Sequence, residues 1–259
     1  MTNNYLLHLQ NIGYSYHTLH GETHVLQNLS FGIKEGEFVA VVGPSGCGKS
    51  TLLSIIAGLL KPESGTIRVN NPDGSLHYPK VGYMLQRDHL FEWRSIHKNV
   101  ILGLEINNML TEERLAYVDK LLKDYDLENF RDKRPSELSG GMKQRAALIR
   151  TLALDPEVLL LDEPFSALDY QTRLSVSADI CNLIRRTGKT VLLITHDLSE
   201  AISLADRIIV LTKRPATVKS EMDIHLTLSD DSPLAARNAP EFKNYFNSLW
   251  EEMRNVESE

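Results

Sequence analysis

The feature that most constrains this chain is the stretch "VVGPSGCGKSTLL" at residues 41–53. Gly43, Gly46 and Gly48 stand close together, directly before Lys49. Glycine inside a helix or strand costs about 0.5–1 kcal/mol relative to alanine, so a packed core gains nothing from this spacing. The stretch therefore indicates a place where the backbone itself has a task.

The segments on either side of these glycines have regular patterns. The apolar run "EFVAVVG" at 37–43 is typical of a strand that is buried on both faces. The segment "KSTLLSIIAGLL" at 49–60 has helical spacing and stops at a Pro/Gly boundary. Between them the sequence fits G-x-x-x-x-G-K-[ST] in the strand-to-helix context that this motif requires. The motif residues and the hydroxyl that follows them are Gly43, Pro44, Ser45, Gly46, Cys47, Gly48, Lys49, Ser50 and Thr51.

This motif predicts a site for the phosphates of a nucleotide such as ATP. Glycines let backbone N–H groups face phosphate oxygens, and the N-terminus of the following helix adds positive potential. Lys49 is expected to reach the β- and γ-phosphates, and the Ser50 hydroxyl to bind Mg²⁺. The alternative is a tight turn with an incidental lysine.

The segment "VLLLDEP" offers the acidic groups that such a site needs. Asp162 ends a second apolar strand, where P-loop proteins hold Mg²⁺ with a carboxylate. Glu163 follows it and is the candidate general base or water-orienting group. Taken alone, Asp-Glu-Pro would be a turn at the end of a strand.

The rest of the chain alternates between strand-like and helical patterns. This alternation predicts an α/β fold with a mainly parallel sheet. A helical and more polar stretch is expected over about 92–154. The expected strands are 5–12, 25–33, 37–43, 65–69, 80–86, 157–164, 190–197 and 207–212.

The C-terminal part has a different character. Residues 226–242 are polar, contain two prolines and resemble a linker. A helix with one apolar face should follow, formed by Phe242, Tyr245, Phe246, Leu249, Trp250 and Met253. We interpret this face as a cover for the chain's own core, with a dimer or partner contact as the alternative.

Composition excludes some classes of protein. A net charge of −6 disfavours a general nucleic-acid binder. No signal peptide is visible at the start and no run of 18 apolar residues occurs, so we expect no membrane span. Cys47 and Cys181 are the only two cysteines, which fits buried thiols in a reducing cytosol rather than a disulfide framework.

The stretch "ELSGGMKQRAALIRTLALDPEVLLLDEP" contains a second potential anion site. Ser139, Gly140 and Gly141 precede a helix with a basic start, although the chain already has one phosphate cradle. The chain resembles an ATP-binding-cassette (ABC) ATPase, and Leu138 to Gly141 resemble the signature motif of that family. In the family this motif caps the γ-phosphate bound by the opposite subunit. The resemblance therefore implies a homodimer that encloses two ATP molecules.

Other family elements match in order. Gln86 resembles the Q-loop glutamine, a Mg²⁺ and water ligand linked to the transport partner. Ser166 to Asp169 resemble the D-loop at the dimer seam, and His196 resembles the switch histidine at the γ-phosphate. Tyr16 resembles the aromatic residue that stacks on adenine, although Tyr14 lies nearby and either could belong to the core. On its own, His196 would be a satisfied histidine at a strand end.

One residue departs from the family pattern. Met142 stands where the family often has glutamine, but Gln144 and Arg145 follow as in the family. We therefore expect no loss of activity from this departure.

A narrower resemblance concerns "LFEWRSIHKNV" at 90–100 and "GGMKQR". These segments are similar to the ATPases of importers for nitrate, sulfonate, taurine and related small anions or pyrimidines. Trp93 and Arg94 would then face the permease, and the alternative is a packed tryptophan beside a solvated arginine. The length beyond residue 215 is too short for a full regulatory domain, as expected in this branch.

The resemblance implies a single ABC ATPase domain over residues 1–259. Residues 1–89 and 156–215 would form the nucleotide-binding core with an antiparallel β lobe. Residues 90–155 would form the helical signature lobe, and 216–259 an extension with an amphipathic helix.

The implied function is ATP hydrolysis that drives separate integral-membrane permease subunits. The chain would act at the cytoplasmic face of the membrane and be served indirectly by an extracytoplasmic solute-binding protein. The alternatives are a soluble cassette ATPase in DNA repair, translation or iron–sulfur assembly, and a binding module that does not hydrolyse ATP. No nucleic-acid partner is expected.

Overall fold

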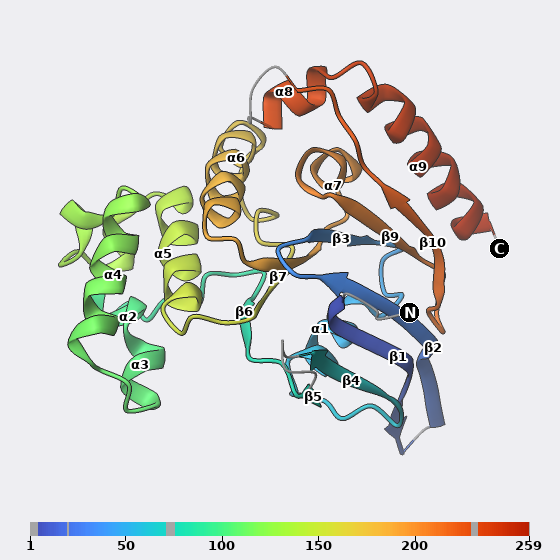
Figure 1. The fold of residues 1–259 in the computed structure, drawn as a ribbon, viewed down its shortest axis with the longest axis horizontal. Coiled ribbons are helices and arrows are strands. Elements are labelled where there is room, and N and C mark those ends of the chain that lie inside the picture. The colour runs from blue at the N-terminus through green and yellow to red at the C-terminus, as the bar shows by residue number, and fades with distance from the viewer. Residues whose placement is uncertain (1–4, 20, 71–75, 229–232, 259) are drawn as a thin grey trace.

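The computed structural model describes residues 5–19, 21–70, 76–228 and 233–258. Its centre is a six-stranded sheet, above and below which the other elements are arranged (Figure 1). Five strands run parallel, and the edge strand β10 is antiparallel to β9. In spatial order the strands are β10 (Val218–Asp223), β9 (Arg207–Leu211), β3 (Phe38–Val42), β8 (Thr190–Ile194), β7 (Val158–Asp162) and β6 (Val81–Met84).

The central strands are buried on both faces, as their continuous apolar runs predict. In β3, Phe38, Ala40 and Val42 face one hydrophobic cluster, and Val39 and Val41 face the other. The two clusters lie on opposite sides of the sheet because successive side chains of a strand point to opposite faces. The predicted α/β fold class with a mainly parallel sheet is therefore confirmed.

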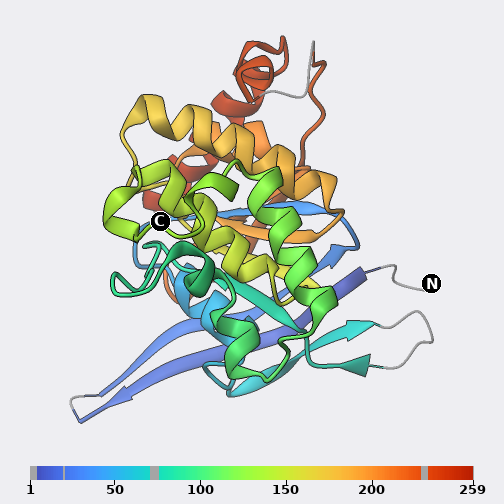
Figure 2. The ribbon, with the colours of Figure 1, turned by 90° about the vertical axis from the view of Figure 1, so that its left-hand side faces the viewer.

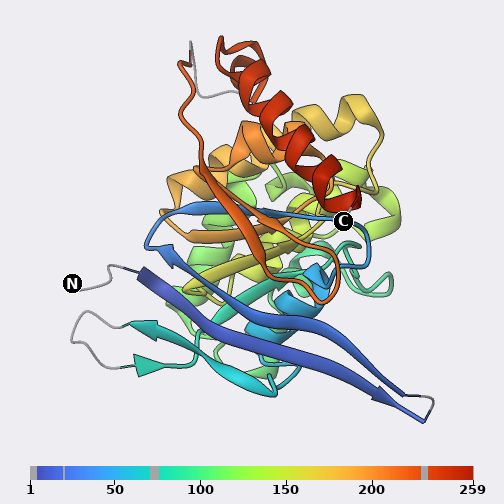
Figure 3. The ribbon, with the colours of Figure 1, turned by 90° about the vertical axis from the view of Figure 1, so that its right-hand side faces the viewer.

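A second, antiparallel sheet has the order β2 (Gly21–Lys34), β1 (Tyr5–Thr18), β4 (Ser64–Asn70) and β5 (Leu76–His77). Helix α1 (Lys49–Ile56) lies between the two sheets (Figures 1 and 2). Strands β1 and β2 are longer than the expected 5–12 and 25–33, and their far ends project from the body as a ribbon (Figure 3). Apolar patterning marked only the halves of these strands that contact the core.

Four helices follow β6 and form a group beside the edge of the large sheet (Figure 1). They occupy the stretch in which the sequence predicts helices. Their bounds are α2 (Ile96–Val100), α3 (Leu102–Ile106), α4 (Glu112–Asp124) and α5 (Gly140–Leu152), with short 3₁₀ turns η1 (Glu128–Phe130) and η2 (Pro135–Glu137). Helices α6 (Tyr170–Arg186) and α7 (Leu198–Leu204) cover the sheet face opposite α1.

The C-terminal part contains two elements that differ from the prediction, α8 and β10. Helix α8 (Pro233–Asn238) lies within the stretch expected to be a linker. It packs on α6 and α7 and buries Ala235 and Ala236, so tertiary contacts stabilise a helix too short to form alone. Residues 229–232 of the expected linker lie outside the described part. The sequence analysis did not predict β10.

Helix α9 (Phe242–Ser258) covers the chain's own core, as we interpreted its apolar face (Figure 3). Leu249 is fully buried, and Phe242, Tyr245, Phe246 and Met253 pack against the same cluster. Trp250 departs from the expectation because 53% of it is exposed. Cys47 and Cys181 are free and buried, as expected. Among the helices of the described ranges, none is long and apolar enough to cross a membrane.

Candidate functional site

The candidate site lies where three parallel strands end side by side. Val41 of β3 and Asp162 of β7 both pair with Ile194 of β8, so the three carboxyl ends are level. Open α/β sheets bind ligands beyond this edge of their strands. The segments that follow the three strands carry the P-loop glycines, Glu163 and His196.

The P-loop has the conformation that its glycines predict. Gly46 and Gly48 have φ values of 74° and 123°, which L-residues with side chains rarely adopt. A Cβ at Gly48 would also lie 2.7 Å from Cγ1 of Val25. Lys49 Nζ donates to the carbonyl oxygens of Gly43 at 2.7 Å and Pro44 at 3.0 Å, so the loop holds its own lysine over the turn.

A cavity of about 260 Å³ opens above the P-loop. Its lining comes from β1, β2, the P-loop, α1 and the segments after β7 and β9. The lining residues are Tyr16, Val25, Ser45, Gly46, Gly48, Lys49, Ser50, Thr51, Glu163 and Arg214.

Tyr16 forms one wall of this cavity. It is 42% exposed, and its hydroxyl lies 3.3 Å from Oγ1 of Thr51. Tyr14 contacts it edge-on, with ring centroids 5.1 Å apart, and packs against the core. Of the two tyrosines, Tyr16 is therefore the one that offers a ring to a ligand.

Three motif residues do not line the cavity with their side chains. Cys47 is buried beneath the loop, and burial raises the pKa of its thiol. Gly43 permits a close approach, because a Cβ there would lie 3.1 Å from both Cys47 Sγ and Leu211 Cβ. The carbonyl oxygen of Pro44 accepts from Lys49 Nζ and from the Cys47 N–H, the latter at 3.2 Å.

Ser50 and Asp162 lie together and offer oxygen atoms to a cation. Ser50 Oγ donates to Asp162 Oδ1 at 3.3 Å, and Tyr83 Oη donates to Oδ2 at 3.3 Å. Burial raises the pKa of Asp162, and burial with the nearby carboxylate raises that of Tyr83 to about 12. Two ligands of an octahedral Mg²⁺ stand about 3 Å apart when adjacent. A partly buried carboxylate beside a hydroxyl therefore fits this ion.

Glu163 occupies an unusual backbone position beside two polar side chains. Its φ is 44°, a left-handed value that is uncommon outside glycine. Its Oε2 lies 3.1 Å from Nδ1 of His196 and 3.4 Å from Nε2 of Gln86. In the described part no hydrogen bond or ion pair reaches its other carboxylate oxygen. That oxygen stays available to a ligand or a water.

Gln86 joins this cluster differently from its expected role as a metal ligand. Its amide nitrogen contacts Glu163 and also Ser166 Oγ, at 3.2 Å. No contact with Ser50 or Asp162 occurs in this conformation. The structure therefore places Gln86 with Glu163 and His196 rather than with the two oxygen ligands.

The remaining motif residues lie away from the cavity. Ser139 caps α5 by accepting from the Met142 N–H at 3.4 Å, and Asp169 caps α6 by accepting from the Thr172 N–H at 3.1 Å. A Cβ on Gly141 would lie 2.7 Å from Cγ2 of Val176, and one on Gly140 would lie 3.1 Å from Cδ2 of Leu168. The glycines thus let the start of α5 approach α6 closely.

The sequence analysis missed three residues near the site. Arg214 lines the cavity, Tyr83 donates to Asp162, and Glu200 is buried behind the switch region, where it accepts a hydrogen bond from Thr195. No motif marks Arg214 or Tyr83. Glu200 is on α7, and only the fold shows that it is buried.

The alternative of a packed Trp93 beside a solvated Arg94 does not hold, because the environments of the two side chains are the reverse. Trp93 is 73% exposed and stacks on Phe91, with ring centroids 4.7 Å apart. Arg94 is largely covered and pairs with Glu105. The structure therefore leaves an aromatic pair at the surface, in the segment that follows Gln86.

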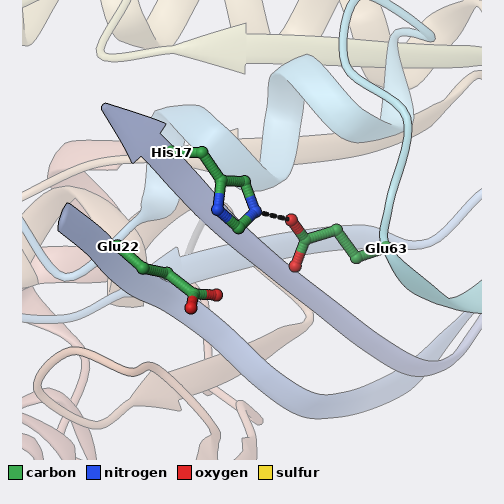
Figure 4. A group of neighbouring side chains, drawn as sticks. All are labelled: His17, Glu22 and Glu63. Carbon is green, nitrogen blue, oxygen red and sulfur yellow. Dashed lines mark hydrogen bonds and ion pairs between the residues drawn. The ribbon is translucent and has the colours of Figure 1, made fainter. Parts of the chain in front are cut away.

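A histidine and two glutamates form a separate polar group next to Tyr16. His17 Nε2 lies 2.6 Å from Glu63 Oε1, and Glu22 stands nearby (Figure 4). The hydrogen bond to Glu63 raises the pKa of His17 and lowers that of Glu63. All three side chains are exposed, and the pair links β1 to the segment before β4.

Comparison with known proteins agrees with this geometry. Residues 26–166 match the family model described as ABC transporter. The chain is 44% identical to a taurine import ATP-binding protein (TauB) of Jannaschia sp., over 78% of this chain and 75% of that protein. It is 40% identical to the nitrate import ATP-binding protein (NrtD) of Synechocystis sp., over 92% and 91%.

A solved structure has the same fold. The ATP-binding cassette MJ0796, determined as a dimer bound to ADP and Pi in a post-hydrolysis state, superposes with a TM-score of 0.70. It is 33% identical, and the match covers 85% of this chain and 99% of that one.

Proposed function

Because this chain belongs to the ABC transporter family of ATP-binding proteins, we propose that it is the ATP-hydrolysing subunit of an importer. The observation that carries the proposal is the convergence of Lys49, Ser50, Asp162, Glu163 and His196 at one edge of a parallel sheet. Each of these residues has the chemistry for one part of nucleoside triphosphate hydrolysis.

The cavity above the P-loop holds the nucleotide in this proposal. The ring of Tyr16 stacks on adenine, and Thr51 lies beside it. Backbone N–H groups of residues 45–51 and the N-terminus of α1 bind the phosphates. Lys49 exchanges its two carbonyl acceptors for phosphate oxygens.

Ser50 and Asp162 hold Mg²⁺ in the same proposal. The bound ion neutralises charge on the β- and γ-phosphates. Gln86 would join these ligands through its amide oxygen, whereas its amide nitrogen contacts Glu163 in this conformation.

Glu163 is the group that acts on the attacking water. His196 and Gln86 both contact Oε2, which fixes the carboxylate and leaves Oε1 to accept a hydrogen bond or proton from water. The attack breaks the bond between the γ-phosphorus and the bridging oxygen and yields ADP and phosphate. His196 is 57% exposed and can turn toward the γ-phosphate.

A second copy of the chain completes the site. Ser139 to Gly141 do not line their own cavity, and Ser139 and Gly140 are exposed at the N-terminus of α5. We place this helix start against the γ-phosphate held by the opposite subunit, with Asp169 at the seam. ATP then favours the closed dimer because it contacts both subunits only there.

The transport partner is a separate permease, and the exposed pair Phe91 and Trp93, in the segment after Gln86, is the surface offered to it. The chain would therefore work at the cytoplasmic face of the membrane. The named relatives import taurine and nitrate. They support a small anion such as a sulfonate, nitrate or taurine, or a pyrimidine, delivered by a solute-binding protein.

The test is light scattering on a Glu163→Gln variant with Mg-ATP. We expect a dimer that forms only with nucleotide, because bound ATP accumulates when water is not activated. Ser139→Tyr in the same background should stay monomeric, since the bulky ring blocks the approach of the γ-phosphate. Thermal unfolding of both variants controls for folding.

A monomer at every ATP concentration, with ATP bound, would contradict the two-site arrangement. Hydrolysis by Glu163→Gln at the wild-type rate would contradict the role of Glu163. Membranes that contain the permease should retain the wild-type chain, and release from them would contradict the importer assignment.

A further inference from the structure

The turn between β9 and β10 carries an arginine to the mouth of the nucleotide cavity. Strand β9 lies beside β3, with Val210 paired to Val42. The end of β9 therefore adjoins the start of the P-loop, and a Cβ at Gly43 would lie 3.1 Å from Cβ of Leu211. Arg214 follows three residues later and is one of the residues that line the cavity.

Backbone hydrogen bonds hold this turn against β2. Ala216 donates its N–H to Val25 O at 2.7 Å and accepts from the Gln27 N–H at 3.0 Å. Within the turn, the Thr217 N–H donates to Thr212 Oγ1 at 2.9 Å. Val25 also packs on Gly48. The turn therefore contacts the P-loop before Arg214, through Leu211 and Gly43, and after it, through Ala216 and Val25.

The charge of Arg214 is not used elsewhere in the described part of the chain. Arg207, on the neighbouring strand, pairs with Glu37 and Glu221. In contrast, the guanidinium of Arg214 forms no ion pair with any described carboxylate. Lys49, Glu163 and Arg214 are the charged residues in the cavity lining, so Arg214 supplies one of its two positive charges.

We propose that Arg214 binds the phosphate groups of the nucleotide in its own subunit. This inference rests on the proposed function, since it needs a nucleotide in the cavity. A triphosphate near Asp162 and Glu163 places like charges together, and a guanidinium offsets them while donating to two phosphate oxygens. Arg214 thus acts from the turn after β9 on a ligand that the P-loop holds.

The experiment measures binding of ATP, ADP and adenosine to the full chain in excess EDTA, which prevents Mg²⁺-dependent hydrolysis. Isothermal titration compares wild type, Arg214→Gln, Arg214→Lys and Lys213→Gln. The last variant is the matched control, because it removes the same charge from the adjacent residue, which does not line the cavity. Thermal unfolding without nucleotide shows whether each variant is folded.

We expect Arg214→Gln to weaken ATP and ADP about tenfold, which corresponds to about 1.4 kcal/mol, and to leave adenosine unchanged. Arg214→Lys should recover part of this loss as a point charge. Lys213→Gln should change ATP binding less than twofold. Raising the salt concentration should reduce the difference in ATP affinity between wild type and Arg214→Gln.

Three results would overturn the inference. Equal affinities of wild type and Arg214→Gln for ATP would show that Arg214 does not bind the phosphates. Equal losses for ATP and adenosine would assign Arg214 to the nucleoside or to the fold. Equal losses in Arg214→Gln and Lys213→Gln would reduce the effect to overall charge. Failure of wild type to bind ATP would instead contradict the proposed function itself.

Discussion

Glu200 is a carboxylic acid buried behind the segment that carries His196. It is 7% exposed, and the Thr195 hydroxyl donates to it. Burial is the largest influence and raises the pKa of Glu200 from 4.5 to about 7. The hydrogen bond from Thr195 lowers the pKa, but burial outweighs it. At neutral pH this residue is therefore divided between its two protonation states.

The pKa of Glu200 makes stability depend on pH. A carboxyl whose pKa is higher in the folded state stabilises the fold fully below the unfolded value of 4.5, and this stability is lost as the pH rises through about 7. Glu200→Gln does not titrate. Between pH 4.5 and pH 8, we expect the free energy of unfolding of wild type to fall by about 2–3 kcal/mol relative to that of this variant.

Urea unfolding of both proteins at several pH values measures this difference. Glu251→Gln, on the exposed side of α9, removes the same charge from the surface and controls for overall charge. A difference between wild type and Glu200→Gln that stays constant with pH would show that Glu200 does not titrate in this range.

At the scale of elements, the contact between α5 and α6 depends on Gly141. A Cβ there would lie 2.7 Å from Val176, closer than side-chain carbons pack. We expect Gly141→Ala to lower the free energy of unfolding by about 1–3 kcal/mol and to weaken the proposed nucleotide-dependent dimerisation, because α5 must shift. Chemical unfolding and light scattering measure the two effects.

A double-mutant cycle identifies the cause. If the clash with Val176 is responsible, Val176→Ala should make Gly141→Ala less destabilising than it is in wild type. Gly140→Ala is the matched comparison and should cost less, since its Cβ would lie 3.1 Å from the flexible end of Leu168. Additive effects of Gly141→Ala and Val176→Ala would contradict the steric explanation.

Helix α9 offers two adjacent residues with opposite environments. Leu249 is fully buried against the core, whereas Trp250 is 53% exposed. We expect Leu249→Ala to cost about 2–5 kcal/mol, since it leaves a cavity, and Trp250→Ala to cost less than about 1 kcal/mol. Urea unfolding compares them, and a larger loss from Trp250→Ala would mean that α9 packs through a different face.

Element prediction succeeded where burial was complete and failed where it was partial. Strands β3, β7, β8 and β9 have continuous apolar runs because both faces contact a core. Strand β10 is an edge strand with a mixed pattern, and α8 is short and gains stability only from contacts with α6 and α7. Such elements depend on neighbours that are distant in sequence, so local patterns do not reveal them.

At the scale of the whole molecule, Trp93 is a residue that we expect to serve partner binding rather than the stability of the fold. It is 73% exposed and stacks only on Phe91 among the described aromatic rings. We expect Trp93→Ala to leave stability and ATP binding of the isolated chain unchanged and to weaken binding to membranes that contain the permease. Co-sedimentation measures this, and Trp250→Ala serves as the control, because Trp250 is another largely exposed tryptophan (53%, against 73% for Trp93) on a different element.

If Trp93→Ala and Trp250→Ala sediment equally with such membranes, the surface at Phe91 and Trp93 is not the permease contact. If Trp93→Ala instead lowers the unfolding free energy by several kcal/mol, its ring has a structural role that its exposure does not reveal. Either result would redirect the search for the partner surface.

The candidate site was predictable as far as its motifs extend. The P-loop, Asp162, Glu163 and His196 could be placed together because each ends or follows a buried parallel strand. The contact of Gln86 with Glu163, the donor Tyr83 and the cavity residue Arg214 could not, because they depend on side-chain directions and on one turn. Sequence patterns thus located the site, and the fold determined which side chains line it.

The cavity lining spans the chain from Tyr16 to Arg214, which has a consequence for synthesis on the ribosome. A nascent chain can form the antiparallel ribbon and the P-loop early, but β7, β8 and β9 must emerge before the strand ends stand level. Until then, ATP has only a partial site and cannot stabilise the unfinished sheet. A nucleotide in this cavity can therefore stabilise only chains that extend past Arg214.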